Sequence, residues 1–233
     1  MDIQLHWTEK GTGIPLVLLH GNGEDGTYFQ NQMEAFSGEY RVIAVDTRGH
    51  GKSPRGTAPF SLGQFAEDLK EFLDERGIKK AVILGFSDGG NTAMLFALKY
   101  PPYVSALILN GANLDPSGVK RSVQLPIELE YRAAGLLAPF SKKAGKTREL
   151  LGLMVKEPRI RPEELKKISV PALVIAGTND MIKEEHTKLI AASLPAGELK
   201  LIAGSHFAAK ENSLEFNRAV KEFLDRQRQE DRL

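Results

Sequence analysis

The sequence predicts an α/β protein with a mostly parallel, doubly wound sheet of about seven strands. Short β-branched, apolar runs recur along the chain, and most are apolar at every position. These runs are bounded by Gly, Pro, Asn or Asp, and longer segments with apolar residues at helical spacing lie between them. Strands that helices cover on both faces have this composition, so the pattern indicates strand–helix–strand units.

The predicted strands begin with an edge strand and continue with six buried ones. Residues 3–7 alternate in polarity and precede the turn signal Gly11-Thr12-Gly13, which indicates an antiparallel edge strand. Uninterrupted apolar character predicts the buried strands at residues 16–19, 42–45, 81–84, 106–109, 172–176 and 199–203.

Helices should cover this sheet. Apolar residues recur at helical spacing in residues 62–73, 91–99, 187–194 and 216–224. The almost wholly polar residues 226–233 are expected to fray.

One segment, residues 115–162, has no strand signal. It has helical character, and Pro126, Pro139 and Pro158 are expected to interrupt it. We interpret it as a helical cap inserted into a core made of residues 1–114 and 163–233. The cap has ten Lys or Arg against five Asp or Glu, a net charge of +5; because the whole chain carries +1, the core carries −4.

Composition limits the partners. The 233 residues contain no cysteine, which excludes disulfides, thiolate zinc sites and cysteine nucleophiles. A net charge of +1 gives no general attraction for nucleic acid or for a membrane, so either would need a local patch. We therefore expect a small-molecule partner. The first residues show no signal-peptide pattern and no run approaches a membrane span, which predicts a cytoplasmic protein.

The strongest chemical motif is Gly85-Phe86-Ser87-Asp88-Gly89. It lies between a predicted strand and a predicted helix, where a sharp turn would present the Ser87 hydroxyl as a nucleophile. Gly85 and Gly89 would leave room for the helix to cross close to the strand.

A serine nucleophile needs a base and a group that orients the base. His206 follows the predicted strand 199–203 and is the expected base, and Asp180 follows strand 172–176 and is the expected acid. Asp115 is the alternative acid. The remaining histidines have structural explanations. His6 lies on the predicted edge strand, His20 in a loop, His50 in a glycine turn and His186 in a charged segment.

The segment His20-Gly21-Asn22-Gly23 also ends a predicted strand. A backbone N–H of Asn22, or alternatively of Gly23, could join the N–H of Asp88 in an oxyanion hole.

Five landmarks in order make the chain resemble the α/β-hydrolase superfamily over essentially its full length. They are His20 to Gly23, the segment Asp46-Thr47-Arg48-Gly49-His50-Gly51-Lys52-Ser53, the turn at Ser87, Val170-Pro171 leading to Gly177 through Asp180, and Gly204 to Phe207.

This resemblance implies a triad of Ser87, Asp180 and His206, oxyanion positions at Asn22 and Asp88, and a cap that looks shorter than is usual in the family. It implies mainly a structural turn for the Asp46–Ser53 segment. Serine rather than aspartate at position 87 argues against dehalogenase and epoxide hydrolase branches. Ser87-Asp88-Gly89-Gly90 is similar to the biphenyl-hydrolase-like branch, which implies an amine-recognising role for Asp88; an acid that favours the helix N-terminus is the alternative.

The sequence thus predicts a serine hydrolase that cleaves a small carboxylic ester through an acyl-enzyme, with an α-amino acid ester as one candidate substrate. No metal ligand cluster or nucleotide-binding pattern is evident, so no cofactor is expected. Two alternatives stay open: a C–C bond hydrolase or lyase on the same triad, and a receptor or regulatory protein that docks through its cap.

Overall fold

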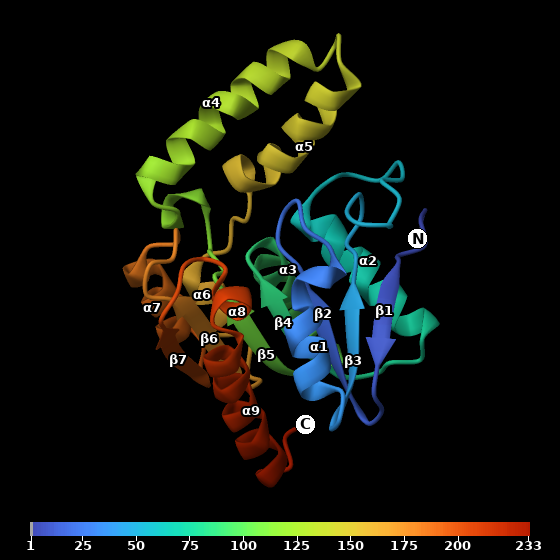
Figure 1. The fold of residues 1–233 in the computed structure, drawn as a ribbon, viewed down its shortest axis with the longest axis vertical. Helices are drawn as coiled ribbons and strands as arrows, with labels where there is room; N and C mark the ends of the chain where they lie inside the picture. The colour runs from blue at the N-terminus through green and yellow to red at the C-terminus, as the bar shows by residue number, and fades with distance from the viewer. Residues whose placement is uncertain (1) are drawn as a thin grey trace.

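The computed structural model describes residues 2–233, and within them one seven-stranded sheet forms the centre of the molecule (Figure 1). The strand order is β1-β3-β2-β4-β5-β6-β7. Strands β2 to β7 pair in parallel, and β1 pairs antiparallel with β3 at one edge. The strands are β1 (Trp7–Lys10), β2 (Ile14–Leu19), β3 (Tyr40–Val45), β4 (Ala81–Phe86), β5 (Val104–Asn110), β6 (Ala172–Gly177) and β7 (Gly197–Ile202). The predicted fold class is confirmed.

The helices connect successive strands or follow the last one. They are α1 (Gln30–Phe36), α2 (Leu62–Glu75), α3 (Asp88–Lys99), α4 (Arg121–Leu137), α5 (Lys142–Lys156), α6 (Pro162–Leu165), α7 (Glu184–Ser193), α8 (Ala208–Glu211) and α9 (Ser213–Gln229). Short 3-10 turns occur at Gly26–Phe29, Pro101–Tyr103 and Pro116–Gly118.

The buried strands place alternate side chains in two apolar cores, which explains why they are apolar at every position. In β2, Val17 and Leu19 enter the core beneath α2, α3 and α7, whereas Leu16 and Leu18 enter the core beneath α1 and α9. Helix α9 contributes Phe223 to the second of these cores. A sheet covered on both faces leaves its strand ends as the places where polar side chains can meet.

The edge strand differs in position from its prediction. It begins at Trp7, the last residue of the predicted run, and pairs with β3 in the register Trp7↔Val45. The backbone before Trp7 forms its hydrogen bonds with the turn after β3. The N–H of His6 donates to the Ser53 hydroxyl, and the His6 carbonyl accepts the N–H of Asp46. The turn after β3 therefore takes the hydrogen bonds that an earlier strand would have used.

The C-terminal prediction was wrong for residues 226–229, since α9 continues to Gln229. Gln227 is buried, and ion pairs join Arg226 to Glu198 and Arg228 to Glu39. These contacts hold a polar segment in helical form.

Helices α4 and α5 lie antiparallel and project from the sheet as a helical hairpin (Figure 1). Pro126 lies inside α4 and does not interrupt it, contrary to expectation; the helix continues to Leu137 and packs against α5. Pro139 lies between the two helices, and Pro158 follows α5. Within residues 2–233, no helix has both the length and the apolar character needed to cross a membrane.

Candidate active site

The carboxyl ends of four parallel strands bring the predicted polar residues to one edge of the sheet. His20 follows β2, Ser87 follows β4, Asp180 lies beyond β6 and His206 lies beyond β7. Because these strands are parallel, their carboxyl ends meet on the same side. The topology therefore gathers residues that are far apart in the chain.

Ser87 occupies a strained turn between β4 and α3. Its backbone has φ 53° and ψ −119°, a conformation that residues with side chains rarely adopt. A Cβ atom on Gly85 would lie 2.3 Å from the Gly89 carbonyl oxygen, and one on Gly89 would lie 2.0 Å from that of Leu19. Both glycines are therefore required by close backbone contact, as the motif predicts.

The structure brings Ser87, His206 and Asp180 together. His206 Nε2 lies 3.0 Å from Ser87 Oγ, and His206 Nδ1 lies 2.7 Å from Asp180 Oδ1. Asp180 Oδ1 also accepts the N–H of Ile182 at 2.8 Å, which fixes the carboxylate. With its proton on Nδ1, the imidazole donates to Asp180 and accepts the Ser87 hydroxyl hydrogen. The arrangement can remove a proton from Ser87.

The other histidines have structural partners. His6 Nδ1 lies 2.9 Å from Asp46 Oδ2, and His20 Nε2 accepts the N–H of Thr47 at 3.0 Å. His186 Nε2 accepts the N–H of Leu114 at 2.9 Å. Burial lowers the pKa of His20 and His186, so both rings favour their neutral form.

His50 is also held by its neighbours. Its Nδ1 lies 3.0 Å from the Arg48 carbonyl oxygen, so this nitrogen carries the proton and Nε2 is left as an acceptor. Burial lowers the pKa of His50 to about 4. The ring is therefore neutral at physiological pH.

Asp115, the alternative acid, lies in a different environment. Its carboxylate caps the turn Pro116–Gly118 by accepting the N–H of Ser117 at 2.7 Å. Asp180, not Asp115, therefore contacts the imidazole of His206.

The expected oxyanion donors flank Ser87. A Cβ on Gly21 would lie 3.2 Å from the Ser87 Cβ, so the loop that carries Asn22 passes next to the serine. Asp88 is the first residue of α3, and its N–H has no intrahelical acceptor. Among residues 2–233, neither this N–H nor that of Asn22 donates to a backbone carbonyl outside a helix or strand. Neither N–H is therefore taken up by such a backbone acceptor.

The Asn22 side chain connects this loop to the hairpin. Its Nδ2 donates to the carbonyl of Leu150 in α5 at 2.7 Å. The loop after β2 and the helix above it are thus joined by a direct hydrogen bond.

The Asp88 carboxylate is buried. Oδ1 accepts Asn91 Nδ2 at 3.2 Å, while Oδ2 has no partner among the described residues. Burial is the main cause that raises the pKa of Asp88 to about 7, and the nearby charge of Glu157 adds to it. The carboxyl group is therefore close to half ionised at neutral pH.

Sequence analysis did not identify the amide network behind Asp88. Asn91 Nδ2 donates to Asn113 Oδ1 at 2.9 Å, and Asn91 Oδ1 accepts the N–H of Asn113 at 2.8 Å. Asn113 follows β5, so its place at a strand end was a usable signal. These paired amides fix the orientation of Asn91 and therefore its contact with Asp88.

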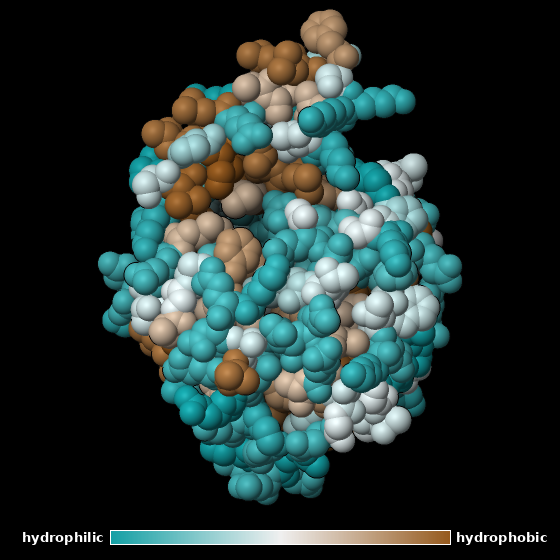
Figure 2. Space-filling view, viewed as in Figure 1, coloured by the Kyte–Doolittle hydropathy of each residue, from teal (hydrophilic) through white to brown (hydrophobic). Residues whose placement is uncertain are grey.

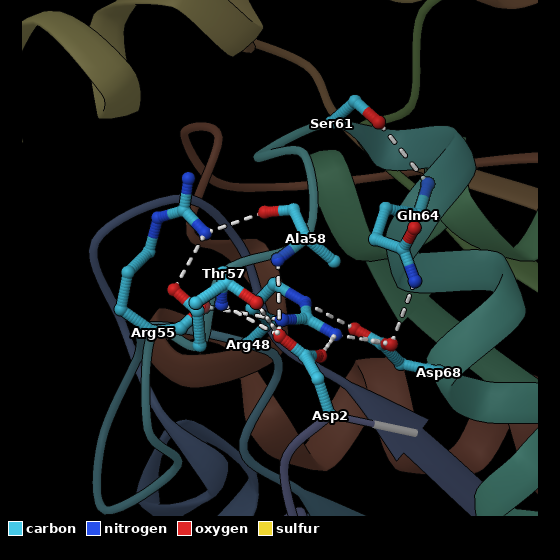
Figure 3. A network of polar contacts seen from close by, with 9 residues as sticks. Asp2, Arg48, Arg55, Thr57, Ala58, Ser61, Gln64 and Asp68 are labelled. Atoms are coloured by element: carbon cyan, nitrogen blue, oxygen red, sulfur yellow. Dashed lines mark hydrogen bonds and ion pairs between the residues drawn. The ribbon is translucent and has the colours of Figure 1, made fainter.

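The Asp46–Ser53 segment forms the expected turn. Asp46 accepts the N–H groups of Gly26 and Lys52, and Ser53 donates to the Asp46 carbonyl. At its centre, buried Arg48 donates two 2.7 Å hydrogen bonds to Asp68 and lies 2.6 Å from Asp2 (Figure 3). These ion pairs anchor the loop that continues to Ser61.

A large cavity lies between this loop and the hairpin. Its volume is about 900 Å³, and basic side chains line much of it, including Arg55, Lys146, Arg148 and Lys156. None of Ser87, Asp180 and His206 lines it. Among residues 2–233, no group of three or more His, Asp or Glu side chains is arranged to hold a metal ion.

Comparison with known proteins shows the family to which this chain belongs. A family model described as the alpha/beta hydrolase fold matches residues 14–135. The chain belongs to the α/β-hydrolase family. This α/β-hydrolase is 32% identical to a 2-hydroxy-6-oxononadienedioate/2-hydroxy-6-oxononatrienedioate hydrolase of Burkholderia vietnamiensis, over 97% of its own length and 92% of the relative. It is 28% identical to human serine hydrolase BPHL, over 95% of this chain and 83% of the relative.

The structure of this α/β-hydrolase is similar to solved structures of other hydrolases. A thermophilic esterase from Thermogutta terrifontis aligns with a TM-score of 0.79 at 25% identity, over 96% of this chain and 94% of that one. A hydrolase from Pseudomonas aeruginosa aligns with a TM-score of 0.77 at 25% identity, over 95% and 94%. The protein is a hydrolase of this fold.

Proposed function

We propose that this α/β-hydrolase cleaves small carboxylic esters by acyl transfer to water. Ser87 is the nucleophile, His206 the general base and Asp180 the acid that orients it. The observation that carries the proposal is the continuous contact from Ser87 Oγ through the imidazole to Asp180, at distances of 3.0 and 2.7 Å. A free hydroxyl is a weak nucleophile, and such a pair of contacts activates it.

In the first step, Ser87 Oγ attacks the ester carbonyl carbon while His206 Nε2 takes the hydroxyl proton. The tetrahedral intermediate carries its negative charge on the former carbonyl oxygen. The N–H groups of Asn22 and Asp88 stabilise this charge. The imidazolium formed on His206 is stabilised by Asp180.

In the second step, His206 gives its proton to the alcohol oxygen as the ester C–O bond breaks. The acyl group stays on Ser87 Oγ, and the alcohol leaves. Water then attacks the acyl carbon while His206 again takes a proton, and the collapse of this intermediate returns that proton to Ser87. The products are a carboxylic acid and an alcohol.

The finer proposal is that the substrate is an α-amino acid ester whose ammonium group Asp88 recognises. Four residues that line one narrow cavity around Asp88 each have a buried polar atom with no hydrogen-bond partner among residues 2–233: Asn22 Oδ1, His50 Nε2, Asp88 Oδ2 and Thr92 Oγ1. All four can accept a hydrogen bond, which suits a donor-only ammonium group.

This cavity does not admit a water molecule in the described conformation. A lining side chain must therefore move before an amine can enter. Leu153 on α5 lines the cavity as well, so a displacement of the hairpin would widen it.

A fluorophosphonate probe tests the general proposal. The wild-type protein should be labelled stoichiometrically on the peptide that contains Ser87, and 4-nitrophenyl acetate should give a burst of 4-nitrophenol followed by steady turnover. Labelling at another serine, or turnover that survives complete labelling, would overturn the assignment.

A second candidate is cleavage of a C–C bond in a dicarboxylate on the same three residues. Its support is the 32% identity to the Burkholderia relative, which is named for its dioate substrates. The direct comparison is kcat/KM for 2-hydroxy-6-oxononadienedioate, followed by its loss of absorbance, against kcat/KM for an alanine ester. A much higher value for the dicarboxylate would select the second candidate.

A further inference from the structure

The exposed apolar side chains of this protein concentrate on the helical hairpin. Among the described residues, nine large apolar side chains are exposed, and five of them lie on α4 or the turn that follows it: Leu125, Leu129, Leu136, Leu137 and Phe140. Figure 2 shows hydrophobic atoms gathered along this helix and at the far end of the hairpin. Scattered exposed apolar residues are ordinary, but a cluster of this kind indicates a binding surface.

The cluster is most exposed where the hairpin turns. We call residues 132–148 the hairpin tip. Leu136, Leu137 and Phe140 are 78%, 57% and 88% exposed. Leu129 and Leu136 are seven positions apart on α4, so the tip continues an apolar stripe along one helix face. Nothing in the described chain covers these side chains.

The tip is also strongly basic. It contains five exposed cations, Arg132, Lys142, Lys143, Lys146 and Arg148, and no acidic residue. Among residues 2–233, none of the five forms an ion pair. The chain as a whole carries only +1, so this concentration of charge is local. It is the kind of patch that attraction to an anionic surface requires.

Shape decides which partner fits. The turn between α4 and α5 projects far from the sheet, so the tip is a convex end rather than a groove (Figure 1). Protruding apolar side chains with cations around them can enter a lipid headgroup layer while the cations contact anionic headgroups. A second copy docking tip to tip would bring ten positive charges together, which disfavours a symmetric dimer at this surface.

We propose that the hairpin tip docks on anionic lipid surfaces. Leu136, Leu137 and Phe140 enter the interface, and Lys142, Lys143 and their basic neighbours bind the headgroups. The proposal does not depend on the identity of the ester substrate. It assigns a role to the part of the chain that carries the net charge of +5.

The test is co-sedimentation of the full chain with vesicles of phosphatidylcholine alone and of phosphatidylcholine mixed equally with phosphatidylglycerol. The wild type should bind the anionic vesicles at least about tenfold more tightly, and high salt should remove most of this difference. Two variants, Leu136→Ser/Phe140→Ser and Lys142→Glu/Lys143→Glu, should each reduce the binding about tenfold or more.

Matched controls exist outside the hairpin. Leu214→Ser removes an apolar side chain that is 87% exposed on α9, and Lys79→Glu/Lys80→Glu reverses two exposed charges before β4. Both should bind like the wild type, and circular dichroism should show every variant folded. The proposal would be overturned if control and tip variants lost vesicle binding equally, or if the wild type bound neutral and anionic vesicles equally well. Concentration-dependent dimerisation that only the tip variants abolish would assign the surface to a second copy instead.

Discussion

His206 Nε2 lies 3.0 Å from Ser87 Oγ although 119 positions separate the two residues in the chain. Neither residue could approach the other within a single helix or hairpin. They meet because β4 and β7 are parallel members of one sheet and each residue follows the carboxyl end of its strand. The contact is thus a product of topology.

Replacement of Ser87 or His206 by Ala should lower ester turnover by about 10⁴-fold or more, because each change removes a member of a group that acts as a unit. His186→Ala is the matched control: His186 accepts a hydrogen bond from the Leu114 backbone and should leave turnover near that of the wild type. Steady-state kinetics checks all three variants. Low activity in His186→Ala together with high activity in His206→Ala would reverse the assignment of the base.

Asp88→Asn should reduce the preference for an amino ester. The quantity to measure is kcat/KM for an alanine ester divided by that for the matching propionate ester. Loss of a charge-assisted contact should lower this ratio about tenfold or more, corresponding to about 1.5–3 kcal/mol. A wild type that shows no preference for the amine would leave Asp88 as a helix N-terminal acid.

The contribution of Asp88 to the stability of the folded protein should fall as pH rises from about 4 to about 7. Burial raises its pKa in the folded state from 3.8 to about 7, so the folded protein binds a proton that the unfolded chain has released. Asp88→Asn should therefore raise the free energy of unfolding at pH 8 by up to about 4 kcal/mol and change it little at pH 4. Urea denaturation at both pH values measures the effect, and a gain of the same size at pH 4 would contradict it.

Gly89→Ala should lower the free energy of unfolding by about 3 kcal/mol or more, because the new methyl group would lie 2.0 Å from the Leu19 carbonyl oxygen. Gly145→Ala is the control. It lies in α5 with no atom within 4 Å of the added carbon and should stabilise the helix by about 0.5–1 kcal/mol. Thermal denaturation should show opposite shifts for the two variants.

Arg48→Met should lower the free energy of unfolding by about 3–5 kcal/mol, because it leaves the buried Asp68 carboxylate without its cation. The double variant Arg48→Met/Asp68→Leu should recover much of the loss, since the unpaired charge is then gone. Glu184→Gln, which breaks an exposed pair with Lys188, should change stability by less than about 1 kcal/mol. Equal effects of Arg48→Met and Glu184→Gln would show that burial of the pair has no consequence.

Much of the fold could be predicted because burial imposes a simple pattern. Leu16 to Leu19 face two cores in alternation, and this double burial produces the uninterrupted apolar run. Prediction failed where contacts distant in sequence decide the outcome. Strand β1 begins only at Trp7 because the backbone of His6 forms its hydrogen bonds with the turn near Asp46. Helix α1 was not predicted because it has too few apolar residues to show helical spacing.

The candidate site could be predicted to a different extent. Gly85 and Gly89 flank Ser87 because two backbones pass close together, a constraint that leaves a visible motif. The amides of Asn91 and Asn113 leave no such motif: the place of Asn113 after β5 is their one signal, and a buried asparagine otherwise resembles an exposed one in sequence. The contact of Asn22 with α5 depends on how the hairpin is placed, which no local pattern encodes.

That single hydrogen bond makes the hairpin and the loop after β2 thermodynamically linked. Any molecule that prefers one position of the hairpin also biases the loop that carries the Asn22 N–H, and a transition state that holds the loop biases the hairpin by the same free energy. Coupling of this kind is reciprocal. A surface that binds α4 and α5 would therefore also shift the position of the Asn22 N–H beside Ser87, without contacting that loop directly.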